Sequence, residues 1–287
     1  MTGNSTASRL ALRSAALGYL GILLIAPVAL IFYKVWDDGF GAPFDAITSP
    51  AGVHAIQLSL ITVAVAVPLN TVFGVGCALM LVRREFPGRG LINAVIDLPF
   101  ALSPVVIGLS LYLVYANTGW FGEWLGENGI RVVFSTPGIV LACVFVSLPF
   151  VVRETMPVLR EIGTEQEEAA ATLGASGWQT FWRITLPAIR WGVGYGVVLT
   201  TARVLGEFGA VTIVSGQIAG ETQTVPLWIE QQFREFDQPG AYMGAIVLAL
   251  LAFAALFAMQ LVGRRTDTVS AAPALTTDGT EPKEAER

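Results

Sequence analysis

Two charged residues stand inside an apolar stretch of this 287-residue chain. Arg203 and Glu207 are four positions apart, so on a helix their side chains share one face and can form an ion pair. Charges inside a membrane are costly and usually mark a functional site. One interpretation has Arg203 meeting an anion that moves through a pathway, while Glu207 tunes or gates that contact. The other, which we favour, has the pair fixing its helix against neighbouring helices.

Other residue patterns that would support chemistry are absent from the sequence. Cys77 and Cys143 lie in separate apolar segments without His or Cys partners, which indicates small core residues rather than a metal site. No G-x-x-x-x-G-K-[ST], H-E-x-x-H or G-x-S-x-G pattern occurs, and no basic patch interleaved with aromatic residues. We therefore expect no catalytic residue, no metal, no cofactor and no nucleic-acid site in this chain.

The composition places these residues in a membrane protein. The chain is 54% hydrophobic and 14% charged, whereas a soluble domain carries about 25% charged residues. A membrane span needs roughly 20 apolar residues. Six segments meet this length, at residues 15–36, 53–82, 91–116, 133–157, 188–215 and 239–262. The sequence predicts an all-α, polytopic membrane bundle over 15–265, an N-terminal cytoplasmic segment over 1–14 and a disordered polar tail over 266–287.

Basic residues are distributed unevenly between the two sides that these spans define. One side holds Arg9, Arg13, Arg83, Arg84, Arg89, Arg153, Arg160, Arg183, Arg190, Arg264 and Arg265, and the other holds Lys34, Arg131 and Arg234. The richer side is predicted to be cytoplasmic, so both termini face inward, in agreement with an even number of spans. Asp97 lies on this side close to Arg84 and Arg89, and we expect an interfacial ion pair there.

Glycines in the fifth predicted span suggest how it packs. Gly192 and Gly196 form a small-xxx-small pair, which favours close approach of another helix. Gly206 and Gly209 flank Glu207 and could allow the span to bend at the level of the charges.

The polar segment between the fourth and fifth predicted spans begins with a short acidic helix. Thr164 and Glu167 have the spacing of a capping box, and acidic residues in a first turn favour helix formation. Three alanines follow, and Gly174 is typical of the residue that ends a helix. The small-residue face of this helix would let another protein approach closely.

A second short helix is predicted after Gly174. Ser176 and Gln179 have the spacing of another capping box. Trp178, Phe181 and Trp182 follow at helical spacing, so we expect these aromatic side chains to lie against the bundle, before Pro187 opens the fifth span. From these patterns alone, the two helices could dock on a partner or simply lie at the membrane surface.

The same loop matches the pattern EAA–x3–G–x9–I–x–LP. The matching residues are Glu168, Ala169, Ala170, Gly174, Ile184, Leu186 and Pro187. This resembles the EAA loop of permease subunits in binding-protein-dependent ABC importers. The resemblance implies a type I importer fold in which the loop is the coupling helix. It also implies that Glu168, Ala169, Ala170 and Gly174 contact a cleft in a separate ATPase subunit.

Longer stretches narrow the resemblance. DLPFALSPVVIGL, SLPFVVRETMPVL and GEFGAVTIVSG are similar to segments of sulfate/thiosulfate importer permeases, especially their W-type subunits. This implies sulfate or thiosulfate as cargo and a bacterial inner membrane as location. The implied partners are a second related permease, two ATPase copies that bind ATP and Mg, and an extracytoplasmic sulfate-binding protein. Specificity would lie mostly in the binding protein.

Two alternatives remain open. Molybdate or tungstate permeases share GEFGA-like and SPVV-like segments, but work as homodimers. A passive anion channel, from another functional class, would lack a docking loop and would need neither ATP nor a binding protein.

Overall fold

The computed structural model describes residues 6–37, 39 and 41–267, and all regular elements within them are helices. In chain order these are α1 (Thr6–Leu20), the π-helical turn η1 (Gly21–Ile25), α2 (Ala26–Asp37), α3 (Gly41–Thr48), α4 (Pro50–Arg83), α5 (Arg89–Ala101), α6 (Pro104–Tyr115), α7 (Gly122–Glu127), α8 (Thr136–Glu161), α9 (Glu165–Thr172), α10 (Gly177–Thr180), η2 (Phe181–Thr185), α11 (Leu186–Leu205), α12 (Gly209–Ser215), α13 (Val225–Arg234) and α14 (Gln238–Asp267). The predicted all-α class is confirmed.

Three of the six predicted spans are single helices. By length and composition, α4, α8 and the part of α14 from Gln238 to Phe257 are each able to cross a membrane. They correspond to the predicted spans over 53–82, 133–157 and 239–262.

The other three predicted spans each consist of two helices that meet at a bend. The bends are 42° between α1 and α2, 112° between α5 and α6, and 55° between α11 and α12. The span predicted over 91–116 is therefore not one helix but the bent pair α5 and α6. Leu102 and Ser103 are extended, and Pro104 begins α6, because proline disfavours helical backbone in the residue before it. The described chain thus has three spans, or six if each bent pair crosses once.

The central helix of the bundle is α8, which contacts α4, α5, α6, α11 and α12. Two neighbouring helices approach it closely through glycine. A Cβ added at Gly74 of α4 would lie 2.7 Å from the Val151 Cβ, and one added at Gly196 of α11 would lie 2.7 Å from the Val151 Cα. A Cβ at Gly192 would lie 2.7 Å from the Glu154 carbonyl oxygen. The close packing predicted from Gly192 and Gly196 is therefore confirmed, with α8 as the partner.

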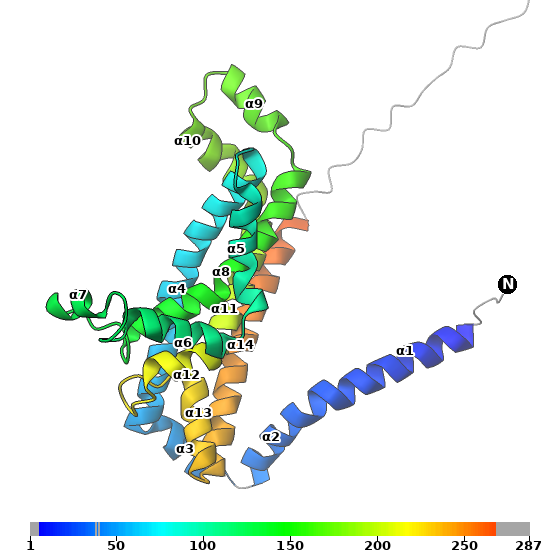
Figure 1. The fold of residues 1–287 in the computed structure, drawn as a ribbon. Coiled ribbons are helices and arrows are strands. Elements are labelled where there is room, and N and C mark those ends of the chain that lie inside the picture. Colours follow the sequence, from blue (N-terminus) through cyan, green and yellow to red (C-terminus); the bar gives the residue numbers. More distant parts are fainter. Residues whose placement is uncertain (1–5, 38, 40, 268–287) are drawn as a thin grey trace, which may run out of the picture.

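Two parts of the chain extend from this bundle. Figure 1 shows α1 and α2 reaching away from it, and many of their large apolar side chains, such as Leu17 and Leu30, are exposed. At one end of the bundle α9 and α10 project together (Figure 1). Of the predicted terminal segments, residues 6–14 and 266–267 are helical, and residues 1–5 and 268–287 lie outside the described residues.

Candidate functional site

The loop between α8 and α11 folds into two helices, as its sequence predicts, and we call Gly163–Thr185 the elbow. α9 ends at a Schellman motif, in which the Ala175 N–H donates to the Ala170 carbonyl and the Gly174 N–H donates to the Ala171 carbonyl, both at 3.0 Å. Gly174 has φ +86°, a left-handed conformation that side chains disfavour. The predicted stop at Gly174 is confirmed.

The second helix of the elbow begins as predicted but does not end where expected. The Gln179 N–H donates to Ser176 Oγ at 3.4 Å and the Ser176 N–H donates to Gln179 Oε1 at 2.9 Å, which confirms the capping box. α10 then continues through η2 into α11 without a break, so Pro187 does not open a new helix. The Leu186 N–H bonds to the Phe181 carbonyl, and this wider turn precedes the proline. We call the continuous helix Gly177–Leu205 the lever.

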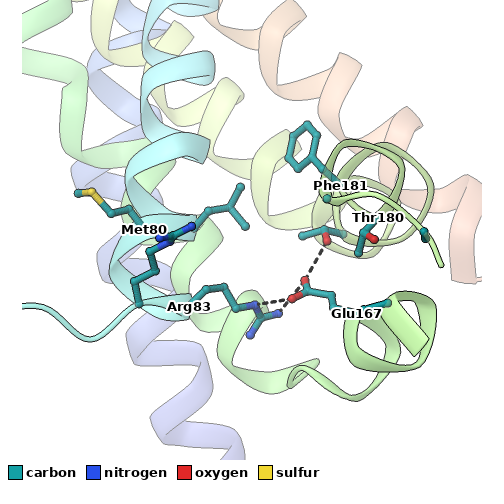
Figure 2. A pocket seen from close by; sticks show the side chains of 11 residues that line it. Met80, Arg83, Glu167, Thr180 and Phe181 are labelled. Atoms are coloured by element: carbon teal, nitrogen blue, oxygen red, sulfur yellow. Dashed lines mark hydrogen bonds and ion pairs between the residues drawn. The ribbon is translucent and has the colours of Figure 1, made fainter. Parts of the chain in front are cut away.

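The capping box predicted for α9 does not form. The Thr164 side chain caps no backbone N–H, and its hydroxyl donates to Glu168 Oε1 at 2.7 Å. Glu167 turns inward, with its Oε2 3.0 Å from Arg83 Nε and its Oε1 accepting from Arg83 Nη2 at 3.2 Å and from Thr185 Oγ1 at 2.8 Å (Figure 2). A guanidinium offers charge as well as donors, so it replaces the weaker backbone partner.

Arg83 also bonds to the end of α8. Its Nη1 donates to the Leu159 carbonyl at 3.0 Å and its Nη2 donates to the Gly163 carbonyl at 2.6 Å. We call Arg83, Glu167, Thr185 and these two carbonyls the Arg83 network. The side chains of Arg83 and Glu167 are 15% and 22% exposed, beside a cleft of about 480 Å³ between α4 and the elbow. Sequence reasoning counted Arg83 only as an orientation signal and missed this arrangement.

The surface of α9 is mainly polar, and a large apolar side chain, Leu173, follows it at the turn to α10. Glu168, Ala169 and Gly174 are exposed, whereas Ala170 is buried inside the elbow. Of the four residues expected to contact a partner, three are therefore accessible. Leu173, which the sequence reasoning did not single out, is 89% exposed beside Gly174. An exposed leucine on a projecting loop is suited to insertion in an apolar cleft.

The aromatic residues of the lever do not all lie where the sequence suggested. Phe181 packs on the core cluster around α4 and α8. Trp178 and Trp182 are 71% and 51% exposed and stack edge to face with a ring distance of 5.5 Å. The expectation that these aromatics lie against the bundle is wrong for both tryptophans, because the bundle covers only one part of the predicted apolar face.

Arg203 and Glu207 form the ion pair that their spacing predicts, at 2.7 Å between Nη1 and Oε2. The Arg203 side chain is 32% exposed, whereas Glu207 is 1% exposed. Glu207 Oε1 also accepts from the Ala210 N–H at 2.8 Å, in the first turn of α12. The pair stands at the bend between α11 and α12, as Gly206 and Gly209 suggested. The carboxylate therefore stabilises both the arginine and the start of the next helix.

Asp97 has a different partner from the one expected. Arg153 of α8 donates through Nε to Asp97 Oδ1 at 2.7 Å and through Nη2 to Oδ2. The expectation of a pair with Arg84 or Arg89 is wrong, since the helix directs Asp97 toward α8. Beside this pair, Phe100 and Phe150 meet edge to face at 5.3 Å. The α5–α8 contact thus includes a bidentate ion pair and an aromatic pair beside the buried Ile96.

Comparison with known proteins agrees with this architecture. The model of the binding-protein-dependent transport system inner membrane component family matches residues 70–268. The chain is 48% identical over 251 residues to the sulfate transport system permease protein CysW of Synechocystis, which covers 88% of this chain and 91% of that protein. It is 39% identical over 247 residues to the sulfate transport system permease protein CysT of Escherichia coli K12, with 86% and 89% covered.

A solved structure has the same fold. A bacterial ABC transporter involved in the import of the acidic polysaccharide alginate contains a chain that matches with a TM-score of 0.75 and 19% identity, covering 89% of this chain and 94% of that one. At this identity the likeness concerns the fold alone. The chain therefore belongs to the binding-protein-dependent transport system inner membrane component family and is a multi-pass membrane permease subunit with an ABC importer fold.

Proposed function

We propose that this chain forms half of the pathway of an ATP-driven importer of sulfate and thiosulfate, in a bacterial inner membrane. The observation that carries the proposal is the projecting elbow with its exposed Leu173 tip, at the loop that matches the coupling-helix pattern. The named sulfate permease relatives support the cargo. The many arginines near the elbow support a cytoplasmic elbow and cytoplasmic termini.

The chain would act with several partners. The separate CysW and CysT relatives support a heterodimer with a second, related permease. Two copies of an ATPase subunit would bind ATP and Mg, since this sequence has no P-loop of its own. The family description supports an extracytoplasmic binding protein, which would deliver the anion and set most of the specificity.

Closure of the ATPase dimer would move the elbow and, through it, the spans. α9 connects covalently to α8, and α10 continues into the lever without a break. A continuous helix transmits displacement along its axis, so a shift at Trp178 would reach the bend beside Arg203. Alternating access would then arise from rigid-body movement of helices that remain packed.

Arg203 and Glu207 would have different tasks in this cycle. Glu207 is buried, with one carboxylate oxygen in the ion pair with Arg203 and the other accepting from the Ala210 N–H. This arrangement suits a structural role that holds the bend. Arg203 keeps one third of its side chain exposed, and we propose that this part faces the pathway. Its paired carboxylate would reduce its attraction for a dianion, so that the cargo passes without being retained.

Reconstitution of the complete complex in proteoliposomes tests the proposed function. We expect uptake of radiolabelled sulfate only with ATP and the binding protein, and competition by thiosulfate more than by molybdate. ATP-independent flux would support the channel alternative, and preferred competition by molybdate would support the molybdate alternative.

Replacing the tip residue tests the docking surface. Leu173→Asp places a charge where an apolar side chain should enter a cleft, so we expect the ATPase subunit to be lost from the purified complex. Trp120→Asp is the matched control, because Trp120 is equally exposed but lies between α6 and α7. Copurification of the ATPase subunit with Leu173→Asp, with normal uptake, would refute the proposed docking surface.

A further inference from the structure

The elbow has a connection to the bundle that does not run along the chain. Along the chain the elbow follows α8 and precedes α11. α4, in contrast, ends at Arg83, 80 positions before Gly163. Arg83 nevertheless reaches the elbow from the last residue of α4 (Figure 2). A third helix is therefore joined to the elbow by side-chain contacts alone.

The geometry of Arg83 is specific to a guanidinium. Nη1 and Nη2 donate in different directions, to the Leu159 and Gly163 carbonyls and to the Glu167 carboxylate, at 2.6–3.2 Å, and Nε lies 3.0 Å from Glu167 Oε2 in the ion pair. The Leu159 carbonyl, in the last turn of α8, belongs to the negative end of the helix dipole, so it favours the same cation as the carboxylate. A lysine could supply the charge but not the fork.

Glu167 extends the connection from α4 to the lever. Its Oε1 accepts from Thr185 Oγ1, and Thr185 is buried in η2, the π-helical turn between α10 and α11. One carboxylate thus joins the end of α4 to the one irregular turn of the lever. Because Glu167 points inward, it contributes little to the outer surface that carries Glu168 and Leu173.

We propose that Arg83 and Glu167 are positioning residues for transport, which connect α4 to the elbow so that α4, α8 and the lever move together when the elbow is displaced. This inference rests on the proposed function of the elbow. The Arg83 network would transmit movement without taking part in docking. A loss of docking would abolish both ATP hydrolysis and import. Breaking the Arg83 network should instead leave ATP hydrolysis in place and reduce import.

Arg83→Gln and Glu167→Gln test the proposal in the reconstituted complex. We expect the ATPase subunit to remain bound and its binding-protein-stimulated ATP hydrolysis to persist, while sulfate uptake per ATP falls about tenfold, as for loss of a coupling contact between two sites. Arg84→Gln is the matched control, because Arg84 lines the same cleft but makes no ion pair within the described part of the chain. It should behave as wild type.

Distances between spin labels test the movement directly. Cysteines would be placed at the exposed Glu85, after α4, and Gln166, in α9, after Cys77 and Cys143 are replaced by alanine. We expect the distance between the labels to be the same with and without ATP, and to shift or broaden with ATP when Arg83→Gln is added. A purely stabilising role would not produce this nucleotide dependence.

Two results would overturn the inference, and neither resembles failure of the proposed function. One is unchanged uptake per ATP in both glutamine variants of a complex whose wild type is coupled. The other is an ATP-dependent distance change in the unsubstituted protein. If Arg83→Gln does not assemble, Glu167→Gln carries the test, because it keeps the bonds from Arg83 to α8. A wild-type complex without ATP-dependent uptake would instead refute the proposed function.

Discussion

The two ends of the lever each carry an ion pair, and the pairs differ in what they join. Near the elbow, Arg83 and Glu167 are 84 positions apart and connect α4 with α9. Near the bend, Arg203 and Glu207 are four positions apart and connect the end of α11 with the turn before α12. The elbow pair is partly exposed on both sides, whereas Glu207 is almost fully buried.

This difference separates two uses of charge in one protein. The pair at the bend neutralises a buried carboxylate and holds the start of α12, so it serves stability first. The pair at the elbow joins segments that could move independently, so it serves transmission first. We therefore expect substitutions near the bend to change unfolding, and substitutions in the elbow to change docking and coupling while the bundle stays folded.

The largest effect is expected for Arg203→Met, which leaves Glu207 buried without its partner. Removing one member of a buried ion pair costs about 3–5 kcal/mol. Thermal unfolding of the purified protein in detergent measures this loss, and Arg203→Met/Glu207→Gln should recover most of it. A single variant as stable as wild type would contradict the structural role of the pair. A stable double variant that no longer transports sulfate would support a pathway role for Arg203.

Gly196→Val should have the next largest effect on stability. A Cβ at this position would lie 2.7 Å from the Val151 Cα, so α11 must move away from α8. Overpacking of this kind costs about 1–3 kcal/mol. Gly194→Val is the control on the same helix, since a Cβ there has no neighbour within 4 Å. Equal unfolding temperatures for the two variants would show that the close approach does not limit packing here.

In the elbow, Gly174→Ala should weaken docking rather than folding of the bundle. A left-handed backbone costs a residue other than glycine about 1–2 kcal/mol, and Gly174 has φ +86° with open space around it. We expect less ATPase subunit to copurify, with an unchanged unfolding temperature. Gly177→Ala is the control, because Gly177 begins α10 without a left-handed backbone. A lowered unfolding temperature without loss of docking would contradict the assignment of docking to the elbow and of stability to the bend.

The smallest effect is expected for Ser176→Ala, which removes half of a capping box. Loss of an N-cap side chain costs about 1 kcal/mol. Because α10 continues into the lever, only its first turn should fray. Hydrogen exchange at the Gln179 and Thr180 amides would detect this opening. Gln179→Ala, which removes the other half of the box, provides the comparison, and equal protection in wild type and Ser176→Ala would exclude a role for the cap.

Short-range patterns were the most reliable part of the sequence. The stop at Gly174, the cap at Ser176 and the Arg203–Glu207 pair each involve residues a few positions apart, so local backbone geometry decides them. The prediction failed where a distant group competed. The box at Thr164 was lost because Arg83 attracts Glu167, and the pairing of Asp97 with Arg84 or Arg89 was lost because Arg153 faces it from α8.

The bend between α5 and α6 was hidden for a related reason. The segment over 91–116 is mostly apolar, and hydropathy responds to the length of such a segment and not to its direction. A Cβ at Gly108 of α6 would lie 2.6 Å from the Ala210 carbonyl oxygen, and one at Gly209 would lie 3.0 Å from the Pro104 Cβ. α6 therefore turns away from the direction of α5 and packs closely on α12. This direction depends on contacts between the two helices and not on hydropathy.

Local sequence patterns were enough to predict an all-α membrane chain, the positions of its apolar segments and the two helices of the elbow, because hydropathy and capping depend on neighbouring residues. Tertiary contacts were needed to set how far three predicted spans bend, to continue the second elbow helix into the lever, and to join α4 to the elbow through Arg83. These features depend on contacts between residues up to 84 positions apart, for which the local pattern holds no signal.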